Sequence, residues 1–237
     1  MMQLRPYQEQ AFDSVFHEWD GGHKKTLVVM PTGTGKTIVF AKIVEECVRR
    51  GYRVLIMAHR GELLDQAADK IFKATGLRSS VEKAGETCLG QWYRVVVGSV
   101  QTLMSEKRLR KFPTDYFNVI IVDECQFMTE PQIDQLRAIV DDFEVPVLCF
   151  GLRTDFKTKL FPGSLRLMEL ADVIEEIKTM CDCGAKATVN ARINDGYIVT
   201  EGAQVVLGGN DCYIAMCHRC YKAGIREHKK IKLHGQN

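Results

Sequence analysis

The sequence predicts an α/β fold in which a parallel sheet is flanked by helices, with a small β-hairpin unit near its C-terminal end. Short apolar runs alternate with amphipathic segments over the first 150 residues or so, as they do in parallel sheets. A glycine-rich segment that ends in Gly-Lys-Thr follows the first apolar run. Five of the nine cysteines fall within residues 181–220. The first two observations predict one large nucleotide-binding domain. The cysteine cluster indicates a second, smaller unit after it.

Composition indicates a globular chain with a real core. Of the 237 residues, 46% are hydrophobic and 26% are charged, and the net charge of +2 does not by itself indicate binding to nucleic acid or to a membrane. No apolar run reaches the roughly 18 residues of a membrane span. The first residues, "MMQLRPYQEQ", lack the apolar segment of a signal peptide. We therefore expect a cytoplasmic protein without membrane contact, in which clustered cysteines bind metal rather than form disulfides.

Apolar β-branched runs predict five strands that are covered on both faces. They are residues 26–30, 53–58, 94–99, 118–122 and 146–150. Between them, residues 36–51 and 61–76 repeat apolar side chains at helical spacing, and each segment ends at a glycine that can cap a helix. Strands that alternate with helices predict a parallel sheet with helices on both sides.

The pattern changes near Thr179, where cysteines and glycine pairs begin. The alternating segments "ATVNARI" (187–193) and "AQVVLGG" (203–209) suggest a β-hairpin. The final residues are polar and basic, which is typical of a solvated tail. We expect a nucleotide-binding domain over 1–178, a small subdomain over 179–221 and a basic tail over 222–237.

The segment "MPTGTGKT" (30–37) predicts a P-loop that binds ATP with magnesium. Gly33 and Gly35 let the backbone turn tightly, so that successive N–H groups face the phosphates. Lys36 would reach the β- and γ-phosphates, and the hydroxyl of Thr37 would meet magnesium. The expected ATP and magnesium contacts in this loop are Thr32, Gly33, Thr34, Gly35, Lys36 and Thr37.

Two acids, Asp123 and Glu124, end the apolar run in "VIIVDECQF". The carboxyl end of a parallel strand is the edge where ligands bind in open α/β sheets. We expect Asp123 to hold magnesium through water and Glu124 to face the γ-phosphate as a base. That base could serve a water molecule or a substrate hydroxyl.

The first half of the chain resembles the first motor domain of superfamily-two helicases of the DEAD/DEAH kind. The resemblance covers about residues 3–126 and includes "LRPYQEQA", "AHRGELLDQ", "GSVQTL" and "VDECQ". It implies that Gln8 contacts adenine and that this half contacts nucleic acid. The next strand of such helicases should carry Ser/Thr-Ala-Thr, but the chain reads "VPVLCFGLRTDF" there. A second motor domain, which completes the helicase ATP site, is not expected from this sequence.

From about residue 120 to 221 the chain resembles cellular-type thymidine kinases. The segments "VDECQF", "VLCFGLRTDFKTKLFPGS" and "VVLGGNDCYIAMCHRCY" carry this resemblance. It implies thymidine as substrate, a homo-oligomer and a loop held over the nucleoside. The implied nucleoside contacts are Phe127, Leu152, Phe156, Phe161, Val206, Leu207 and Tyr213. The first half departs from the kinase pattern in its phosphate loop and in "MAHRGELLDQ", so the chain reads as a mosaic.

Two cysteine pairs, Cys181-x-Cys183 and Cys217-x-x-Cys220, flank the predicted hairpin. Together they can offer four thiolates to one structural zinc ion. The first pair has a shorter gap than usual, so Cys212 or His218 could replace one ligand. Such a site would hold a subdomain that is otherwise poor in apolar residues.

These features leave three hypotheses open. The first is a thymidine kinase in which Glu124 accepts the proton of the 5′-hydroxyl. The second is a nucleic-acid-stimulated ATPase in which Glu124 aligns a water molecule. The third is a nucleotide-binding fold without catalysis. The first is favoured because the second half brings a base, an acceptor pocket and a covering loop to a generic phosphate loop.

Overall fold

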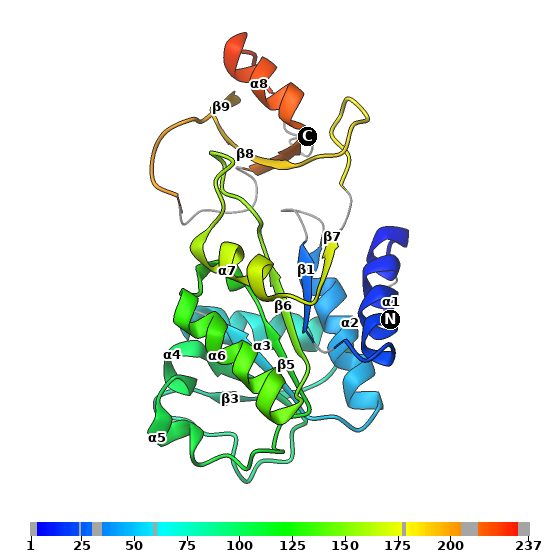
Figure 1. Cartoon of the computed structure of the whole chain (residues 1–237), viewed down its shortest axis with the longest axis vertical. Coiled ribbons are helices and arrows are strands. Elements are labelled where there is room, and N and C mark those ends of the chain that lie inside the picture. The colour runs from blue at the N-terminus through cyan, green and yellow to red at the C-terminus, as the bar shows by residue number, and fades with distance from the viewer. Residues whose placement is uncertain are drawn as a thin grey trace.

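The computed structural model describes residues 4–23, 25–29, 35–58, 61–176, 179–204 and 213–231. Two sheets lie toward opposite ends of the long axis of the molecule (Figure 1). The large sheet and its helices are built from residues up to 176, and the small sheet is built from residues after 188. The change of pattern near Thr179 therefore coincides with the passage between them.

The large sheet has seven strands in the order β3-β4-β2-β5-β6-β1-β7, and its strand pairs are parallel. Five strands begin and end within one residue of the predicted runs, so that prediction is confirmed; β3 and β7 were not predicted. The strands are β1 Lys25–Val29, β2 Val54–Ala58, β3 Ser79–Glu82, β4 Val95–Ser99, β5 Val119–Val122, β6 Val147–Gly151 and β7 Val173–Glu176.

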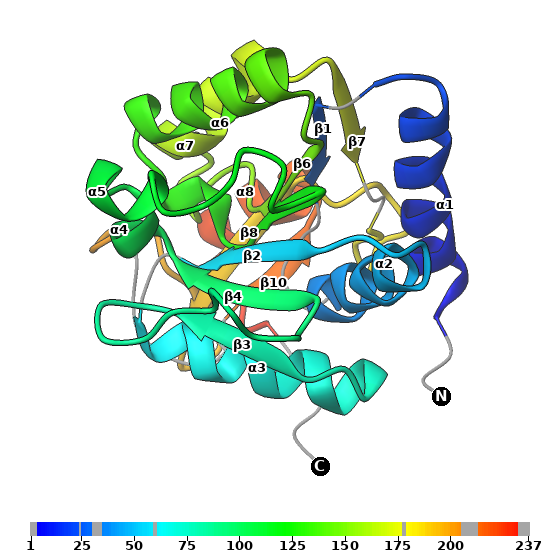
Figure 2. The same cartoon turned by 90° about the horizontal axis from the view of Figure 1, so that it is seen from below.

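Helices cover both faces of this sheet (Figure 2). Successive strand residues point to opposite faces, so each strand feeds two apolar cores. In β2, Val54 and Ile56 pack with α1, α2 and α3, whereas Leu55 and Met57 pack with α4, α6 and α7. The helices are α1 Pro6–Asp20, α2 Lys36–Arg49, α3 Gly61–Thr75, α4 Val100–Leu103, α5 Glu106–Leu109, α6 Glu130–Phe143 and α7 Pro162–Leu170.

The small sheet is antiparallel and has the order β10-β8-β9. Its strands are β8 (Val189–Asn194), β9 (Tyr197–Ile198) and β10 (Tyr213–Met216), and α8 (His218–Arg226) follows them. The predicted strand 187–193 is confirmed as β8. Of the other predicted strand, residues 203–204 are not extended and 205–209 lie outside the described residues. The partners of β8 are β9 and β10.

Residues 222–231 differ from the expected solvated tail. The helix α8 continues to Arg226, and Ile225 and Ile231 pack on the core of the small sheet. The N–H of Ile231 donates to the carbonyl of Gly196 at 2.7 Å. The two isoleucines and this hydrogen bond connect the basic segment to the small sheet. No helix in the described part of the chain has the length and apolarity needed to cross a membrane.

Candidate active site

The end of the phosphate loop, residues 35–37, and the acidic pair lie at the carboxyl edge of the large sheet. The strand β1, which leads into the loop, is separated from β5 by β6 alone. Residues 30–34, and with them Thr32, Gly33 and Thr34, lie outside the described residues. Gly35 is the N-cap of α2 with φ of 77°, a left-handed conformation that glycine adopts without strain. Lys36 and Thr37 then open the helix.

Gln8 lies against the end of this loop. Its side chain is 3% exposed, and its Oε1 accepts a hydrogen bond from the N–H of Arg5 at 2.9 Å. A Cβ atom on Gly35 would lie 2.5 Å from Nε2 of Gln8, so only glycine fits here. The two motifs of the first half are thus in contact. Adenine binding by Gln8 stays a prediction.

Asp123 and Glu124 follow β5 and are held in different ways. The N–H of Asp123 donates to the carbonyl of Met57, and Oδ1 of Asp123 accepts from the N–H of Glu124, both at 3.0 Å. Burial is the largest cause that raises the pKa of Asp123, the negative charge of Glu124 also raises it, and Lys36 opposes both effects, so that the pKa lies at about 6. Lys36 is therefore close enough to act on this carboxyl. A cation bound between Asp123 and a phosphate group would favour the charged form of this buried carboxyl.

Three of the predicted nucleoside contacts gather around the short 3₁₀ helix η1 (Cys125–Phe127). The rings of Phe127 and Phe161 meet edge to face, with centroids 5.8 Å apart. The carbonyl of Leu152 accepts a hydrogen bond from the hydroxyl of Ser164 at 2.6 Å. Because α7 approaches η1 so closely, a Cβ on Gly163 would lie 2.6 Å from the carbonyl oxygen of Cys125. The fold thus brings Phe127, Leu152 and Phe161 beside the acidic pair.

Phe156 and Tyr213 meet at a side chain that the sequence analysis did not single out, Arg192 of β8. The guanidinium of Arg192 lies 3.8 Å from the centroid of the Phe156 ring, and its Nε donates to the hydroxyl of Tyr213 at 3.1 Å. It also donates to the carbonyls of Ala203 and Gln204, at 2.9 and 3.1 Å. Its side chain therefore bridges the residues on both sides of segment 205–212. Val206 and Leu207 lie outside the described residues.

Arg192 is 7% exposed, which is rare for an arginine. The signal in the sequence that could have pointed to this residue is an arginine within the alternating segment "ATVNARI". Its partners come from three separate segments of chain, so sequence spacing did not link them. The same holds for Gln126, which is 1% exposed beside the acidic pair. In the sequence, Gln126 stands only as one letter of the motif "VDECQF".

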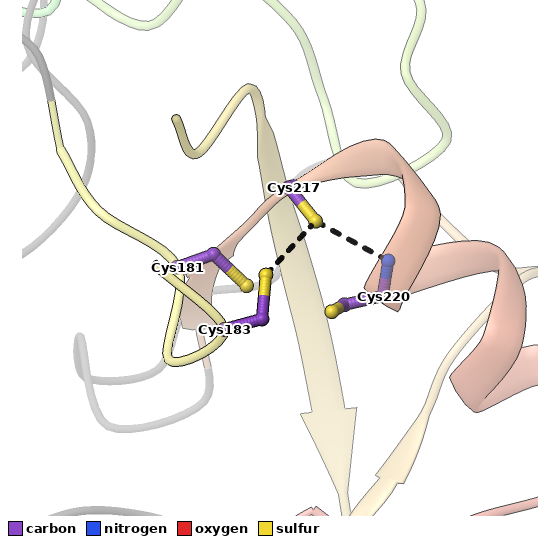
Figure 3. A group of neighbouring side chains, drawn as sticks. All are labelled: Cys181, Cys183, Cys217 and Cys220. Carbon is purple, nitrogen blue, oxygen red and sulfur yellow. Dashed lines mark hydrogen bonds between the residues drawn. The ribbon is translucent and has the colours of Figure 1, made fainter. Parts of the chain in front are cut away.

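The four cysteines of the two predicted pairs converge (Figure 3). Cys181 and Cys183 lie on the loop before β8, and Cys217 and Cys220 lie at the start of α8. Their sulfur atoms all lie within 4.8 Å of one another. The Sγ atoms of Cys183 and Cys217 are 3.6 Å apart, and the N–H of Cys220 points at Sγ of Cys217 at 3.4 Å.

The pKa of the Cys217 thiol is lowered to about 7, chiefly by the hydrogen bond from the Cys220 N–H, whereas the neighbouring thiols raise the pKa of Cys220 to about 12. A thiolate is the form that binds metal. Four such groups at one point could hold a metal ion. Of the alternative ligands, His218 lies next to the cluster with its ring 6.4 Å from that of Tyr221, and Cys212 lies outside the described residues.

Solved structures with a similar fold include helicases. The crystal structure of T4 UvsW matches with a TM-score of 0.55 at 18% identity, over 75% of this chain and 35% of that chain. The Pyrococcus furiosus Hef helicase domain matches with a TM-score of 0.54 at 20% identity, over 73% of this chain and 37% of that chain. At such identities the likeness concerns the fold, and it agrees with the helicase-like first half.

Curated relatives are thymidine kinases. The thymidine kinase of Pasteurella multocida is 51% identical over 107 residues, which are 45% of this chain and 56% of that protein. The thymidine kinase of Legionella pneumophila (strain Lens) is 50% identical over 109 residues, which are 46% of this chain and 52% of that protein. The chain thus spans about half the length of the curated relatives it matches.

The family model that describes thymidine kinases matches residues 24–221. The match begins upstream of segment 120–221, whose motifs carry the kinase resemblance, and takes in the phosphate loop. The match also includes the acidic pair, Phe127 and Phe161, and the four clustered cysteines. Although its sheet has the fold of a helicase motor domain, the chain belongs to the thymidine kinase family.

Proposed function

We propose that this protein transfers the γ-phosphoryl group of ATP to the 5′-hydroxyl of thymidine. The observation that carries the proposal is the acidic pair Asp123–Glu124, which lies beside Lys36 and the rings of Phe127 and Phe161 in a chain of this family. The chain matches about half of its curated relatives, so the activity is inferred from the site rather than transferred with their name.

Phosphoryl transfer requires positioning and charge neutralisation more than covalent chemistry. Lys36 and the amides of the phosphate loop would bind the β- and γ-phosphates. Asp123, through water, and the Thr37 hydroxyl would hold magnesium, which neutralises phosphate charge when it is bound. Glu124 would accept the proton that leaves the 5′-hydroxyl of the nucleoside. Each of these groups belongs to the large sheet and its edge.

The acceptor side would combine both sheets. Phe127, Leu152 and Phe161 would flank the thymine ring from the large sheet. Phe156, in the loop between β6 and α7, would contact the ring as well. Tyr213, joined to Phe156 by Arg192, would cover it from the small sheet together with Val206 and Leu207. Residues of the small sheet would thus help to position the nucleoside for Lys36, Asp123 and Glu124 of the large sheet.

The four cysteines would hold zinc in a closed structural site. A tetrahedral zinc with bonds of about 2.3 Å separates its sulfur ligands by about 3.8 Å. The 3.6 Å separation of the Cys183 and Cys217 sulfurs is close to that value. The ion would stabilise the small sheet and take no part in the transfer. We further expect a cytoplasmic homo-oligomer, as the family resemblance implies.

A second candidate, a nucleic-acid-stimulated ATPase, is favoured by the helicase-like fold and by the motifs "AHRGELLDQ" and "GSVQTL". In that case Glu124 would align a water molecule, and the label of ATP would leave as free phosphate.

The decisive experiment incubates the protein with γ-labelled ATP and magnesium, with thymidine or with single-stranded DNA. We expect label in thymidine monophosphate and little free phosphate. Lys36→Ala serves as the blank, because it removes the charge that faces the γ-phosphate. Free phosphate that rises with DNA and ignores thymidine would support the ATPase and overturn the kinase.

A further inference from the structure

We propose that Gln126 is a positioning residue that orients the carboxylate of Glu124 and couples it to the backbone at Leu152. The inference rests on the proposed function, because it assigns to Gln126 a part in the reaction for which Glu124 is the base. Neither resemblance drawn from the sequence gave this glutamine a role.

Gln126 makes two hydrogen bonds in opposite directions. Its Nε2 donates to Oε2 of Glu124, two residues before it. Its Oε1 accepts from the N–H of Leu152, twenty-six residues later, at 3.1 Å. With 1% of its surface exposed, the side chain has little water with which to replace either bond. It therefore links the end of β5 to the end of β6.

The chemistry of these partners allows only one orientation of the Gln126 amide. The backbone N–H of Leu152 can only donate, so the atom that faces it must be Oε1. The NH₂ group then necessarily faces Glu124, where it finds a carboxylate, which can only accept. The N–H of Leu152 thus determines that Gln126 presents a donor to the base.

The local backbone is shaped to permit this contact. Glu124 has φ of 52° and ψ of 41°, a left-handed conformation that residues other than glycine seldom adopt. On the other side, a Cβ on Gly151 would lie 2.5 Å from Oε1 of Gln126 and 2.6 Å from Sγ of Cys125. Gly151 therefore leaves the space that the Gln126 amide fills.

A base that is fixed in this way gains in two respects. Its carboxylate keeps one direction, toward the position of the attacking hydroxyl, so less freedom is lost when the reaction begins. It is also connected to Leu152, a predicted contact of the nucleoside, so that base and acceptor are held by one bridge. Removing the bridge should affect the chemical step more than the binding of either substrate.

The test is a double-mutant cycle between Gln126 and Glu124, followed by kcat and by both KM values. Gln126→Leu keeps the volume and removes both hydrogen bonds, and we expect kcat to fall about 10- to 100-fold, as the loss of a hydrogen bond to a charged group implies. The KM for ATP should stay within twofold. In a Glu124→Gln background the same substitution should lower kcat by less than twofold further, because the base it orients is gone.

Two further variants separate the two bonds and guard against misfolding. Gln126→Glu keeps an acceptor for the Leu152 N–H and sets a like charge against Glu124, so its kcat should fall at least as far as that of Gln126→Leu. Gly151→Ala pushes the Gln126 amide aside and should lower kcat in the same direction. The matched control is Gln91→Leu, whose exposed side chain donates to the carbonyl of Thr87 before β4 and should leave kcat unchanged.

Full kcat in Gln126→Glu and Gly151→Ala would overturn the inference, as would losses that multiply in the cycle, which indicate a merely structural role. Failure of the proposed function looks different. In that case the wild type would form no thymidine monophosphate and would release free phosphate. The same cycle, measured on phosphate release, would then decide whether Gln126 orients Glu124 toward water.

Discussion

The large and the small sheet are stabilised by different means. The large sheet is covered on both faces, and β2, β4 and β6 are buried along their whole length. The small sheet has three short antiparallel strands, and its core includes Cys181 and Cys217, two of the four clustered thiols. We therefore expect apolar burial to be sufficient for the first, and the second to depend on a metal ion held by those thiols.

The chemistry divides along the same boundary. Lys36, Asp123 and Glu124 lie at the edge of the large sheet, whereas Arg192 and Tyr213 belong to the small one. The hydroxyl of Tyr221 donates to the carbonyl of Phe156 at 2.8 Å and joins the two parts. We therefore expect changes at Lys36, Asp123 and Glu124 to alter the rate of transfer, and changes in the small sheet to alter the affinity for the nucleoside.

Removal of zinc should have the largest effect and should be confined to the small sheet. Structural zinc binds with about 10–16 kcal/mol in small domains, whereas the core of so small a unit rarely contributes more than about 3–5 kcal/mol. Cys183→Ser should lose the metal, of which we expect about one ion per chain, and should raise the thymidine KM more than the ATP KM. Metal analysis and limited proteolysis would measure this, with new cleavage after residue 179.

The matched control for zinc removal is Cys47→Ala. Cys47 is buried in α2, where burial raises the pKa of its thiol to about 12. This variant should keep its zinc. Protein purified without chelator that carries no zinc would contradict the proposed site, and proteolysis spread evenly over both sheets would contradict the comparison.

Glu124→Gln should lower kcat about 10²- to 10⁴-fold, the usual contribution of a general base. The substitution is nearly isosteric and leaves Asp123 in place, so binding of ATP and magnesium should persist, and zinc content should not change. Steady-state kinetics and nucleotide titration would check this. A variant that transfers phosphate normally would show that Glu124 is not the base.

Asp123→Asn should make the metal-free protein more stable at neutral pH. The pKa of Asp123 is raised from 3.8 to about 6, so between these values the folded protein holds a proton that the unfolded chain has released. The free energy of unfolding therefore falls as pH rises through this window, by at most about 3 kcal/mol. Asparagine does not titrate, so the free energy of unfolding of the variant, relative to that of the wild type, should rise from pH 4 to pH 7.

Urea unfolding at both pH values would measure the difference. Asp142→Asn, which changes an exposed carboxylate on α6, is the matched control and should show no such dependence. An advantage of Asp123→Asn that stays the same at pH 4 and pH 7 would contradict the raised pKa. The expected gain would also show that burial of the Asp123 carboxylate lowers the stability of the large sheet.

The sequence predicted the large sheet well because its strands are continuous apolar runs that need no partner to be identified. It also located Asp123, Glu124 and the four cysteines, since each group is contiguous or closely spaced. It did not predict β3 and β7, whose segments "SSVE" and "VIEE" carry polar residues. Edge strands with one free side need less apolar surface, and a search for apolar runs passes over them.

Contacts between distant segments could not be predicted in the same way. Gln126 finds its second partner at Leu152, and Arg192 finds the ring of Phe156. Nothing in the spacing of these residues indicates that they meet, because the meeting depends on strand order and on how the small sheet lies against the large one. The bridges that orient the site are thus the part that only the structure reveals.

Arg192→Met should have the smallest effect and should test the link between the two sheets. Methionine keeps much of the apolar stem but loses the hydrogen bonds to Tyr213, Ala203 and Gln204, as well as the stacking on Phe156. We expect the thymidine KM to rise about tenfold, equivalent to about 1.4 kcal/mol, while kcat and the ATP KM stay within twofold. Arg219→Met, on the exposed start of α8, is the matched control and should change none of these constants. A fall in kcat without a change in the thymidine KM would show that Arg192 affects the transfer step. It would contradict the expectation that the small sheet controls the affinity for the nucleoside.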